Sequence, residues 1–181
     1  GYSLPANVGG PETLVIASSN SGNTEETLAA AEEALERGVR LLAITTGGAL
    51  AQHAQQRGYP LWQFHYVSQP RAALGWSFGL LLGLSHRLDL LPDLPPMVEE
   101  TVALLRQQQQ NYTASSPISQ NMAKRGAGQV MGRLPVFFGG GLFEPVALRW
   151  KGQMHENAKA WAEAEPMPEA NHNTIAGFGY P

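Results

Sequence analysis

The sequence contains no cysteine, which excludes a disulfide framework, a cysteine-ligated zinc site and a thiol nucleophile. Charge is also scarce: 15% of the 181 residues are charged and the formal net charge is −3, which argues against a broad basic surface for nucleic acid. The longest strongly apolar stretch, residues 75–84, is roughly half the ~20 residues that a membrane-spanning helix needs. Since 43% of the residues are hydrophobic, we expect a globular protein without nucleic acid or membrane as a partner.

The first residues of the sequence do not have the pattern of a signal peptide. No basic segment precedes an apolar run at residues 1–5, so we expect no signal peptide and a cytoplasmic location. The missing initiator methionine and the abrupt end at Pro181 predict that the chain is a fragment of a longer protein.

The first half of the chain alternates between short apolar runs and helical patterns. The expected elements are strand 13–17, helix 24–37, strand 40–45, a short helix ending near Gly58, strand 61–66 and helix 71–90. Asn23 and Glu26 have the spacing of a capping pair at the start of the first helix, and Gly38 follows its end as a left-handed stop. This alternation predicts an α/β fold with parallel strands.

The second half is less regular. The prolines in residues 91–96 predict a break that connects two lobes. Beyond it, the expected elements are helices 97–110 and 119–131, strand 134–138, helix 144–161 and a loop over 162–181. A triple glycine, 139–141, follows the strand, so the order strand, glycine-containing loop and helix occurs in both halves.

The loop after the first strand carries three hydroxyls around Gly22, those of Ser19, Ser21 and Thr24. Free N–H groups at the start of a helix favour an anion such as a phosphate, and hydroxyls add donors without adding charge. An ordinary polar turn with a helix cap explains the same residues, because Ser, Thr and Asn also dominate caps for structural reasons. The loop matches neither a Walker A nor a Gly-x-Gly-x-x-Gly motif.

Residues 19–27 (SNSGNTEET) resemble the signature of sugar isomerase (SIS) domains. The chain is more closely similar to the family of bifunctional phosphoglucose/phosphomannose isomerases, through residues 69–75 (QPRAALG), the triple-glycine segment 135–144, and Glu156 followed by 169–173 (EANHN). The motifs come in order along nearly the whole chain. The resemblance implies two SIS-type αβα lobes with parallel sheets, a phosphorylated hexose as substrate, no cofactor, and a homodimer with shared active sites.

The resemblance assigns the substrate phosphate to Ser19, Ser21 and Thr24. Two parts of the family's site have no counterpart here: an earlier strand with a serine-containing, Gly-rich loop before Gly1, and a lysine and a threonine beyond Pro181. The first lobe is therefore expected to lack its initial strand, and the second lobe to be incomplete. The expected division is a first lobe over 1–91, a linker and connecting helix over 92–118, and a second lobe over 119–181.

The resemblance makes Glu156 the catalytic base, His172 the ring-opening histidine and Arg71 an active-site arginine. Aldose–ketose isomerisation moves a proton between C1 and C2 through an enediolate, which one carboxylate can do as base and then as acid. Histidine suits the proton transfers of ring opening near neutral pH. An arginine could neutralise the enediolate or clamp the phosphate.

The residues alone leave other interpretations of Glu156 open. Its place about 140° around the helix from the apolar side also fits a solvated glutamate, paired with Lys159. Nothing in their spacing excludes the three nearby carboxylates, which are Glu163, Glu165 and Glu169. Taken alone, His172 and Arg71 equally fit surface residues.

The remaining histidines suggest no catalytic or metal site. His155 is next to Glu156 but points about 100° away on a helix, so the two are not expected to line one cleft. His53, His65 and His86 have no partner pattern and are interpreted as structural. We predict no metal site, because His155 and His172 lack a companion histidine three or four residues away.

The leading hypothesis is an enzyme: an aldose–ketose isomerase that interconverts glucose 6-phosphate, and also mannose 6-phosphate, with fructose 6-phosphate. The first alternative is an SIS domain that binds a sugar phosphate without turning it over. The second is an SIS lobe of an amino-sugar-phosphate synthase. A pure sensor does not need Glu156 and His172, which favours the enzyme, although the fragment alone is expected to lack part of the site.

Overall fold

The computed structural model describes residues 1–92 and 94–179 and divides into two compact units, Gly1–Leu81 and Leu82–Pro181. Within the described residues, the first unit has a three-stranded sheet and the second a two-stranded sheet. All strand pairs are parallel, so the predicted α/β class is confirmed.

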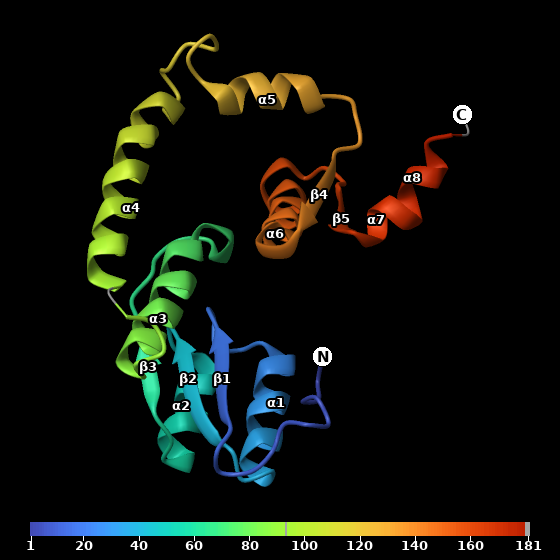
Figure 1. The fold of residues 1–181 in the computed structure, drawn as a ribbon. Helices are drawn as coiled ribbons and strands as arrows, with labels where there is room; N and C mark the ends of the chain where they lie inside the picture. Colours follow the sequence, from blue (N-terminus) through green and yellow to red (C-terminus); the bar gives the residue numbers. More distant parts are fainter. Residues whose placement is uncertain (93, 180–181) are drawn as a thin grey trace. The chain divides into compact units, whose positions relative to one another are not determined.

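The first unit is built from alternating strands and helices (Figure 1). Its elements are β1 (Leu14–Ser19), α1 (Glu25–Glu36), β2 (Arg40–Thr45), α2 (Gly48–Arg57), β3 (Leu61–Gln63), the 3₁₀ turn η1 (Pro70–Ala72) and α3 (Leu74–Arg87), which continues past Leu81. The predicted strands and helices are confirmed to within a few residues, although β3 is half as long as expected. Across the described ranges no helix, α3 included, is both long and apolar enough to cross a membrane.

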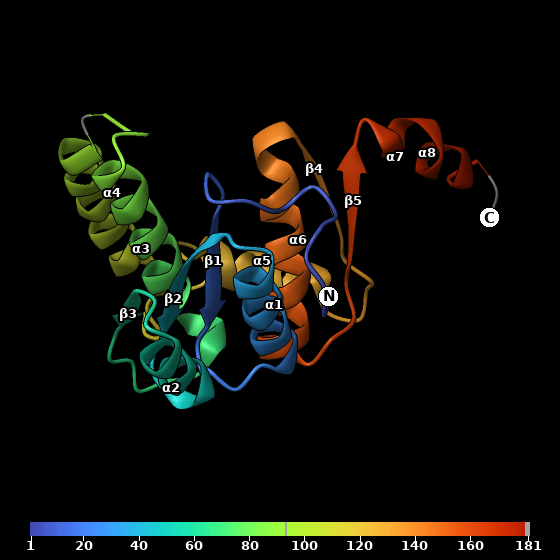
Figure 2. The same cartoon turned by 90° about the horizontal axis from the view of Figure 1, so that it is seen from below.

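The core of this unit lies on one face of the sheet, where α1 and α2 both pack (Figure 2). Its buried side chains are Ala17, Ala31, Ala34, Val39, Leu41, Ala43, Leu50 and Ala54. Because alternate residues of a strand face the same side, Leu41 and Ala43 of β2 meet the helices together. Small alanines at the contacts let α1 and α2 lie close to the strands.

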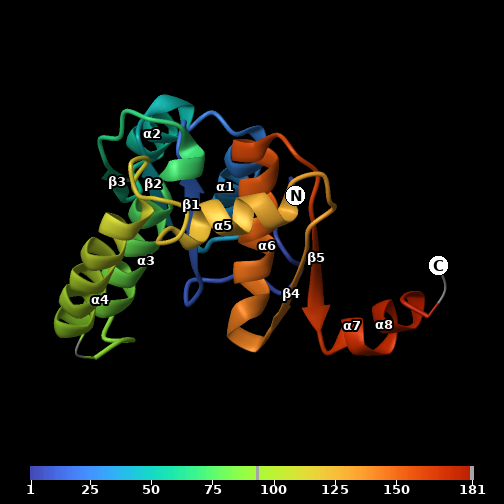
Figure 3. The same cartoon turned by 90° about the horizontal axis from the view of Figure 1, so that it is seen from above.

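The second unit contains helices that connect and flank a strand pair. Its elements are α4 (Leu94–Gln109), η2 (Gln110–Tyr112), α5 (Met122–Val130), β4 (Val136–Gly140), η3 (Gly141–Phe143), α6 (Glu144–Gln153), the π turn η4 (Met154–Ala158), β5 (Glu163–Met167), α7 (Glu169–His172) and α8 (Thr174–Gly177). β4 and β5 pair in register from Val136 opposite Glu163 to Gly140 opposite Met167. α6 runs beside both strands (Figure 3), with Phe137 and Trp150 in ring contact at 5.6 Å.

The predictions for the second unit differ from the structure at several places. Residues 88–92 separate α3 from α4, as the predicted break requires, but α4 begins at Leu94, inside the expected break, because Pro95 and Pro96 occupy its first turn, where a missing N–H costs nothing; Asp93 lies outside the described residues. The expected loop 162–181 contains β5, α7 and α8, since pairing with β4 supplies the hydrogen bonds that the local sequence does not suggest; Tyr180 and Pro181 lie outside the described residues.

Candidate functional site

The hydroxyl loop begins where β1 ends. Ser19 is the last residue of β1 and is buried; its Oγ accepts a hydrogen bond from the Gly22 N–H at 3.0 Å and lies 2.8 Å from Thr24 Oγ1. Ser21 Oγ accepts a hydrogen bond from the Asn23 N–H at 3.2 Å. The structure therefore brings the three predicted hydroxyls together on one turn, where Ser21 and Thr24 are exposed.

Helix α1 starts directly after this loop, and the predicted capping pair is wrong. Thr24 is the N-cap residue, and its side chain makes no capping hydrogen bond. Asn23 does not cap α1 either, because its Oδ1 accepts a hydrogen bond from the Ala49 N–H at 3.0 Å. The N–H groups at the start of α1 are thus left to other acceptors, and an anion is a favourable one.

A second loop, residues 45–48 after β2, supports the hydroxyl loop. The Leu50 N–H donates to the carbonyl oxygen of Gly22 at 2.8 Å. A Cβ on Gly22 would lie 1.8 Å from the Gly47 carbonyl oxygen, and one on Gly48 would lie 2.3 Å from a backbone oxygen of the hydroxyl loop. Gly22 and Gly48 also have positive φ, +71° and +69°. The packing of this loop on the hydroxyl loop was not predicted from the sequence. The pair Gly47 and Gly48, directly after a neighbouring parallel strand, is the sequence feature that could have indicated it.

Asn20 lies between the first two hydroxyl residues. Its carbonyl oxygen accepts hydrogen bonds from the N–H and the Oγ1 of Thr46, at 3.1 and 2.6 Å. Its side-chain Oδ1 is buried and has no hydrogen-bond partner among the described residues. Because buried polar atoms are normally hydrogen-bonded, this unpaired acceptor is an exception within the loop.

Arg71 belongs to the same unit but to a different element. It is the middle residue of η1, which ends directly before α3, and it is half-buried. The helix predicted from residue 71 therefore begins as a 3₁₀ turn. The role of Arg71 toward a ligand stays a prediction.

Glu156 lies in the π turn η4, not in a continuous helix as predicted. α6 ends at Gln153, and Lys159 has a left-handed backbone with φ of +54°, which ends the helical segment. The Lys159 Nζ donates to the carbonyl oxygen of Glu156 at 2.7 Å, so this lysine binds the backbone of Glu156. The Glu156 side chain is exposed on this π-helical turn, and π-helical turns are frequent at functional sites.

His155 closes the connection between η4 and β5. Its Nε2 lies 3.2 Å from the carbonyl oxygen and 3.3 Å from the nitrogen of Ala162, and its ring contacts Trp161 at 5.4 Å. These contacts hold His155 against the segment that leads into β5, so we interpret it as a structural residue. The expectation that the two side chains do not line one cleft stays a prediction.

The three carboxylates that compete with Glu156 for the role of base each accept a side-chain hydrogen bond. Glu163 accepts hydrogen bonds from Lys151 Nζ and Trp161 Nε1, both at 2.7 Å, and the Lys151 bond in particular lowers the pKa of Glu163 below its ordinary value. Glu165 accepts a hydrogen bond from Thr174 Oγ1 at 3.0 Å. Glu169 accepts one from the side-chain amide of Asn173. These hydrogen bonds link side chains of β5 and α7 to residues near them.

His172 ends the short helix α7 and is exposed, whereas a loop was predicted there. α7 follows β5, and η4, which carries Glu156, precedes it (Figure 3). The five residues of β5 span about 15 Å, so Glu156 and His172 belong to segments at opposite ends of this strand.

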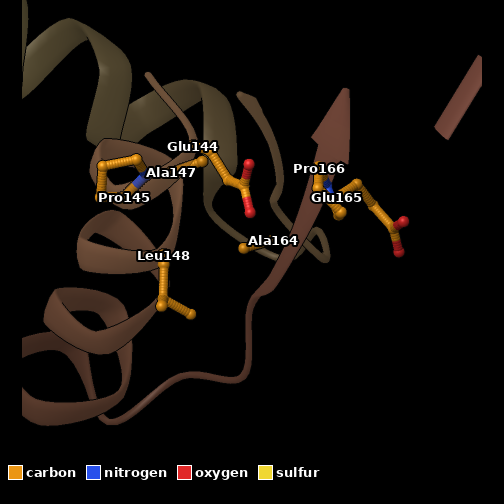
Figure 4. A pocket seen from close by; sticks show the side chains of 7 residues that line it. All are labelled: Glu144, Pro145, Ala147, Leu148, Ala164, Glu165 and Pro166. Atoms are coloured by element: carbon orange, nitrogen blue, oxygen red, sulfur yellow. The ribbon is translucent and has the colours of Figure 1, made fainter. Parts of the chain in front are cut away.

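A pocket of about 240 Å³ lies between α6 and β5. Its lining residues are Glu144, Pro145, Ala147, Leu148, Ala164, Glu165 and Pro166. Figure 4 shows the Glu144 carboxylate directed toward β5, while that of Glu165 points away from the helix. With no basic or hydroxyl side chain in its lining, this pocket lacks the donors that a phosphate needs.

Other titratable groups of the described ranges form structural contacts. His53 binds the Tyr59 hydroxyl through Nδ1 at 2.8 Å and Glu32 Oε2 through Nε2 at 2.6 Å, which fits its structural interpretation. The hydrogen bond from His53 lowers the pKa of Glu32, and burial raises the pKa of Tyr59. Over residues 1–92 and 94–179, no three histidine, aspartate or glutamate side chains gather in a way that could hold a metal ion.

Two family models match separate parts of the chain. The SIS domain matches residues 5–58, and the bacterial phospho-glucose isomerase C-terminal SIS domain matches residues 119–181. The first match contains the hydroxyl loop, and the second contains Glu156 and His172. These matches confirm the resemblance found in the sequence.

Known proteins match along nearly the whole chain. It is 44% identical over 181 residues to a bifunctional phosphoglucose/phosphomannose isomerase of Caldicellulosiruptor bescii, covering 99% of this chain and 53% of that protein. It is 36% identical over 165 residues to a D-glucosamine-6-phosphate 4-epimerase of Sulfolobus acidocaldarius, covering 91% of this chain and 50% of that protein. The chain thus spans about half the length of the curated relatives it matches.

A solved structure shares the fold. The C-terminal domain of a glucosamine-fructose-6-phosphate aminotransferase from Francisella tularensis superposes with a TM-score of 0.62, covering 95% of this chain and 50% of that one. The two sequences are 17% identical, so the likeness concerns the fold alone.

Proposed function

Because this chain belongs to the SIS-domain family, we propose that it is part of an aldose–ketose isomerase that converts glucose 6-phosphate, and also mannose 6-phosphate, into fructose 6-phosphate. The observation that carries the proposal is the supported hydroxyl loop at the start of α1. Relatives named bifunctional phosphoglucose/phosphomannose isomerase support the choice of substrate. The reaction needs no cofactor and belongs to glycolysis and gluconeogenesis, which fits a cytoplasmic enzyme. The division into lobes 1–91 and 119–181 with a linker over 92–118 forms part of the proposal.

The phosphate binds the loop of Ser19, Ser21 and Thr24. Two of these hydroxyls are exposed, and the third fixes the turn through Gly22. The uncapped N–H groups of α1 add donors that favour a dianion.

The chemistry falls to Glu156, His172 and Arg71. Glu156 takes the proton from C2 of the open-chain aldose and returns it to C1, while His172 moves the protons of ring opening. Arg71 stabilises the negative charge of the enediolate or of the phosphate. The exposure of Glu156 and His172 supports these roles, because each can reach a substrate or a second chain.

A homodimer with shared sites completes the proposal. Glu156 precedes β5 and His172 follows it, so the two residues belong to segments at opposite ends of a strand about 15 Å long, and this arrangement supports a site built from two chains. A site confined to one chain is the alternative. Mixing Glu156→Gln and His172→Ala full-length proteins separates the two: shared sites restore activity in the heterodimer, because half of its sites have neither defect. Complete subunit exchange without recovered activity refutes sharing.

The phosphate site is tested by calorimetry on Ser21→Ala combined with Thr24→Val. Each lost hydrogen bond to a charged group should cost roughly 1.5–3 kcal/mol of binding free energy for glucose 6-phosphate. The matched control removes two exposed hydroxyls of the second unit, by Ser115→Ala with Thr101→Val, and should leave the affinity unchanged. Unchanged affinity in the loop variant contradicts the assignment.

The catalytic base is tested in the full-length protein by Glu156→Gln, which keeps the shape and removes the base. Turnover and exchange of the C2 proton with solvent should collapse while substrate affinity changes little. Glu169→Gln is the matched control, because Glu169 is the nearest competitor on α7. Exchange at the parental rate in Glu156→Gln, with loss in Glu169→Gln, moves the base to Glu169.

A second candidate is a reaction on an amino-sugar phosphate, favoured by the 36% identity to a D-glucosamine-6-phosphate 4-epimerase. The same hydroxyl loop would bind that phosphate. Separate assays of the full-length protein with glucose 6-phosphate and with glucosamine 6-phosphate distinguish the two candidate functions, because only the true substrate is converted to product. Binding of either sugar without turnover identifies a sensor.

A further inference from the structure

The π turn η4 is held by contacts on both sides of Glu156. It carries the chain from α6 into β5 (Figure 2). On one side, the His155 imidazole lies against the fully buried Ala162, with Nε2 at 3.2 Å from its carbonyl oxygen and 3.3 Å from its nitrogen. On the other side, the Lys159 Nζ donates to the carbonyl oxygen of Glu156 at 2.7 Å. The backbone of Glu156 is therefore held from both directions, while its side chain is exposed.

A second set of contacts holds the His155 ring. It lies against the ring of Trp161, with centroids 5.4 Å apart. Trp161 Nε1 donates to Glu163 Oε1 and Lys151 Nζ donates to Glu163 Oε2, both at 2.7 Å, so one carboxylate of β5 binds both groups. Since Lys151 belongs to α6, the contacts run from α6 through β5 and back to η4, all within the second unit.

This support matters because the backbone of η4 is intrinsically unfavourable. Its hydrogen bonds join residues five apart instead of four, and the Lys159 N–H donates in this way to the carbonyl oxygen of Met154. The φ of Lys159, +54°, is one that residues with a side chain seldom adopt. Such a conformation persists where its surroundings determine it, and segments of this kind gather at functional sites.

We propose that His155 and Lys159 are positioning residues for Glu156, which hold the π turn in the conformation that presents the carboxylate to the substrate. The inference gives these structural contacts an effect on catalysis, and it rests on Glu156 acting as the base of the proposed isomerase. A general base has to lie within hydrogen-bond reach of the proton that it removes, and a displacement of about 1 Å can lower the rate about 100-fold. The two residues therefore affect proton transfer, whereas phosphate binding depends on the hydroxyl loop of the first unit.

Steady-state kinetics of the full-length protein with glucose 6-phosphate test the role of His155. His155→Ala removes its contacts and should lower kcat about tenfold or more, with KM changed less than about twofold. His155→Gln should restore much of kcat, because a glutamine amide can donate to the carbonyl oxygen of Ala162 and accept from its N–H. His86→Ala is the matched control: it removes another histidine that lies against a backbone carbonyl oxygen, with Nδ1 3.0 Å from that of Leu91, and should leave kcat unchanged.

A double variant separates positioning from a purely structural role. Because His155 acts through Glu156, adding His155→Ala to Glu156→Gln should lower the residual exchange of the C2 proton with solvent no further. An equal further loss in both backgrounds overturns the proposal. A fall in kcat that only follows the loss of folded protein, measured by circular dichroism on the same samples, also overturns it.

Lys159→Met tests the same turn where His155→Ala does not fold. It removes only the hydrogen bond to the carbonyl oxygen of Glu156, so kcat should fall and KM should be retained, and Lys159→Arg should restore kcat. An unchanged kcat in Lys159→Met overturns the proposal.

The outcomes separate this inference from the proposed function. Exchange of the C2 proton at the parental rate in Glu156→Gln refutes the base and, with it, the positioning roles. Collapse of exchange in Glu156→Gln together with parental kcat in His155→Ala overturns the positioning role alone and leaves the base in place.

Discussion

Both units contain a parallel strand, a glycine-containing loop and a helix, yet the two loops differ in what they can bind. In the first unit the loop carries three hydroxyls and leads into a helix without a side-chain cap. In the second, the segment between β4 and α6, residues 141–143, contains no hydroxyl, and α6 begins with Glu144 and with Pro145, which has no N–H. Both α1 and α6 start with acidic residues, so charge does not distinguish the two helix starts. They differ in the number of hydroxyl and N–H donors that could bind an anion.

The glycines of the two loops also serve different purposes. Gly139 lies near the end of β4, and a Cβ there would be 2.2 Å from the Phe143 carbonyl oxygen and 2.9 Å from Ala147 Cβ, so this glycine lets the strand end pack on the turn and helix that follow it. Gly22 instead lets one loop pack on another. A glycine after a strand therefore indicates backbone crowding, and only the neighbouring donors indicate a ligand.

The largest effect is expected from Gly22→Ala, which breaks the contact between the two loops of the first unit. The new Cβ would meet the Gly47 carbonyl oxygen at 1.8 Å, and φ is +71°, so the unfolding free energy should fall by about 3 kcal/mol or more. Urea unfolding measures it. Gly38→Ala is the control, because Gly38 has nearly the same φ, +67°, with nothing within 4 Å; it should cost about 1 kcal/mol. Equal losses would show that φ alone matters.

A smaller effect is expected from Asn121→Ala, which sharpens the contrast between a capped and an uncapped helix. Asn121 is buried at the start of α5, where its Oδ1 accepts a hydrogen bond from the Lys124 N–H at 3.0 Å. Losing this cap should lower the unfolding free energy by about 1–2 kcal/mol. Thr24→Ala at the uncapped α1 should lower it by less than about 1 kcal/mol, measured in the same way. A Thr24 variant as unstable as the Asn121 variant would contradict the contrast.

The smallest effect concerns acid stability of the second unit. The hydrogen bond from Lys151 lowers the pKa of Glu163 below 4.5, so the folded state is stabilised above about pH 4.5 and loses this contribution as the pH falls through the lowered pKa. Lys151→Met should therefore make the unfolding free energy less sensitive to pH below 4.5. Lys159→Met is the control, since that lysine binds a carbonyl oxygen. Acid titrations of unfolding compare the two, and parallel pH curves for Lys151→Met and the parent would contradict the assignment.

Much of the first unit could be predicted from the sequence, because its local signals agree with its fold. The buried strand Arg40–Thr45 has the predicted bounds, and Gly38 has the positive φ expected of a helix stop. The three hydroxyls also meet where they were expected. The hydrogen bond that Asn23 makes instead of capping α1 was not predictable, because its partner, Ala49, lies in α2, 26 residues further along the chain.

The second unit was harder because its structure depends on partners distant in sequence. The segment Glu163–Met167 alternates glutamates with small residues and contains a proline, so nothing local favours a strand. Its pairing with β4 and the contacts of Glu163 with Lys151 and Trp161 make it one. The end of α6 was missed because Lys159 adopts a left-handed backbone without a glycine to signal it. The roles of Glu156, His172 and Arg71 remain predictions.

The contact between the two loops of the first unit has a consequence for the thermodynamics of recognition. Because the Leu50 N–H and the backbone of Gly47 already hold Gly22 in its turn, the loop is ordered before any ligand arrives. Ordering a flexible loop on binding would subtract from affinity, roughly 0.5–1.5 kcal/mol for each side chain that becomes fixed. A preformed loop avoids this entropic loss, so a phosphate meets its donors in their final positions, and association need not wait for the loop to rearrange.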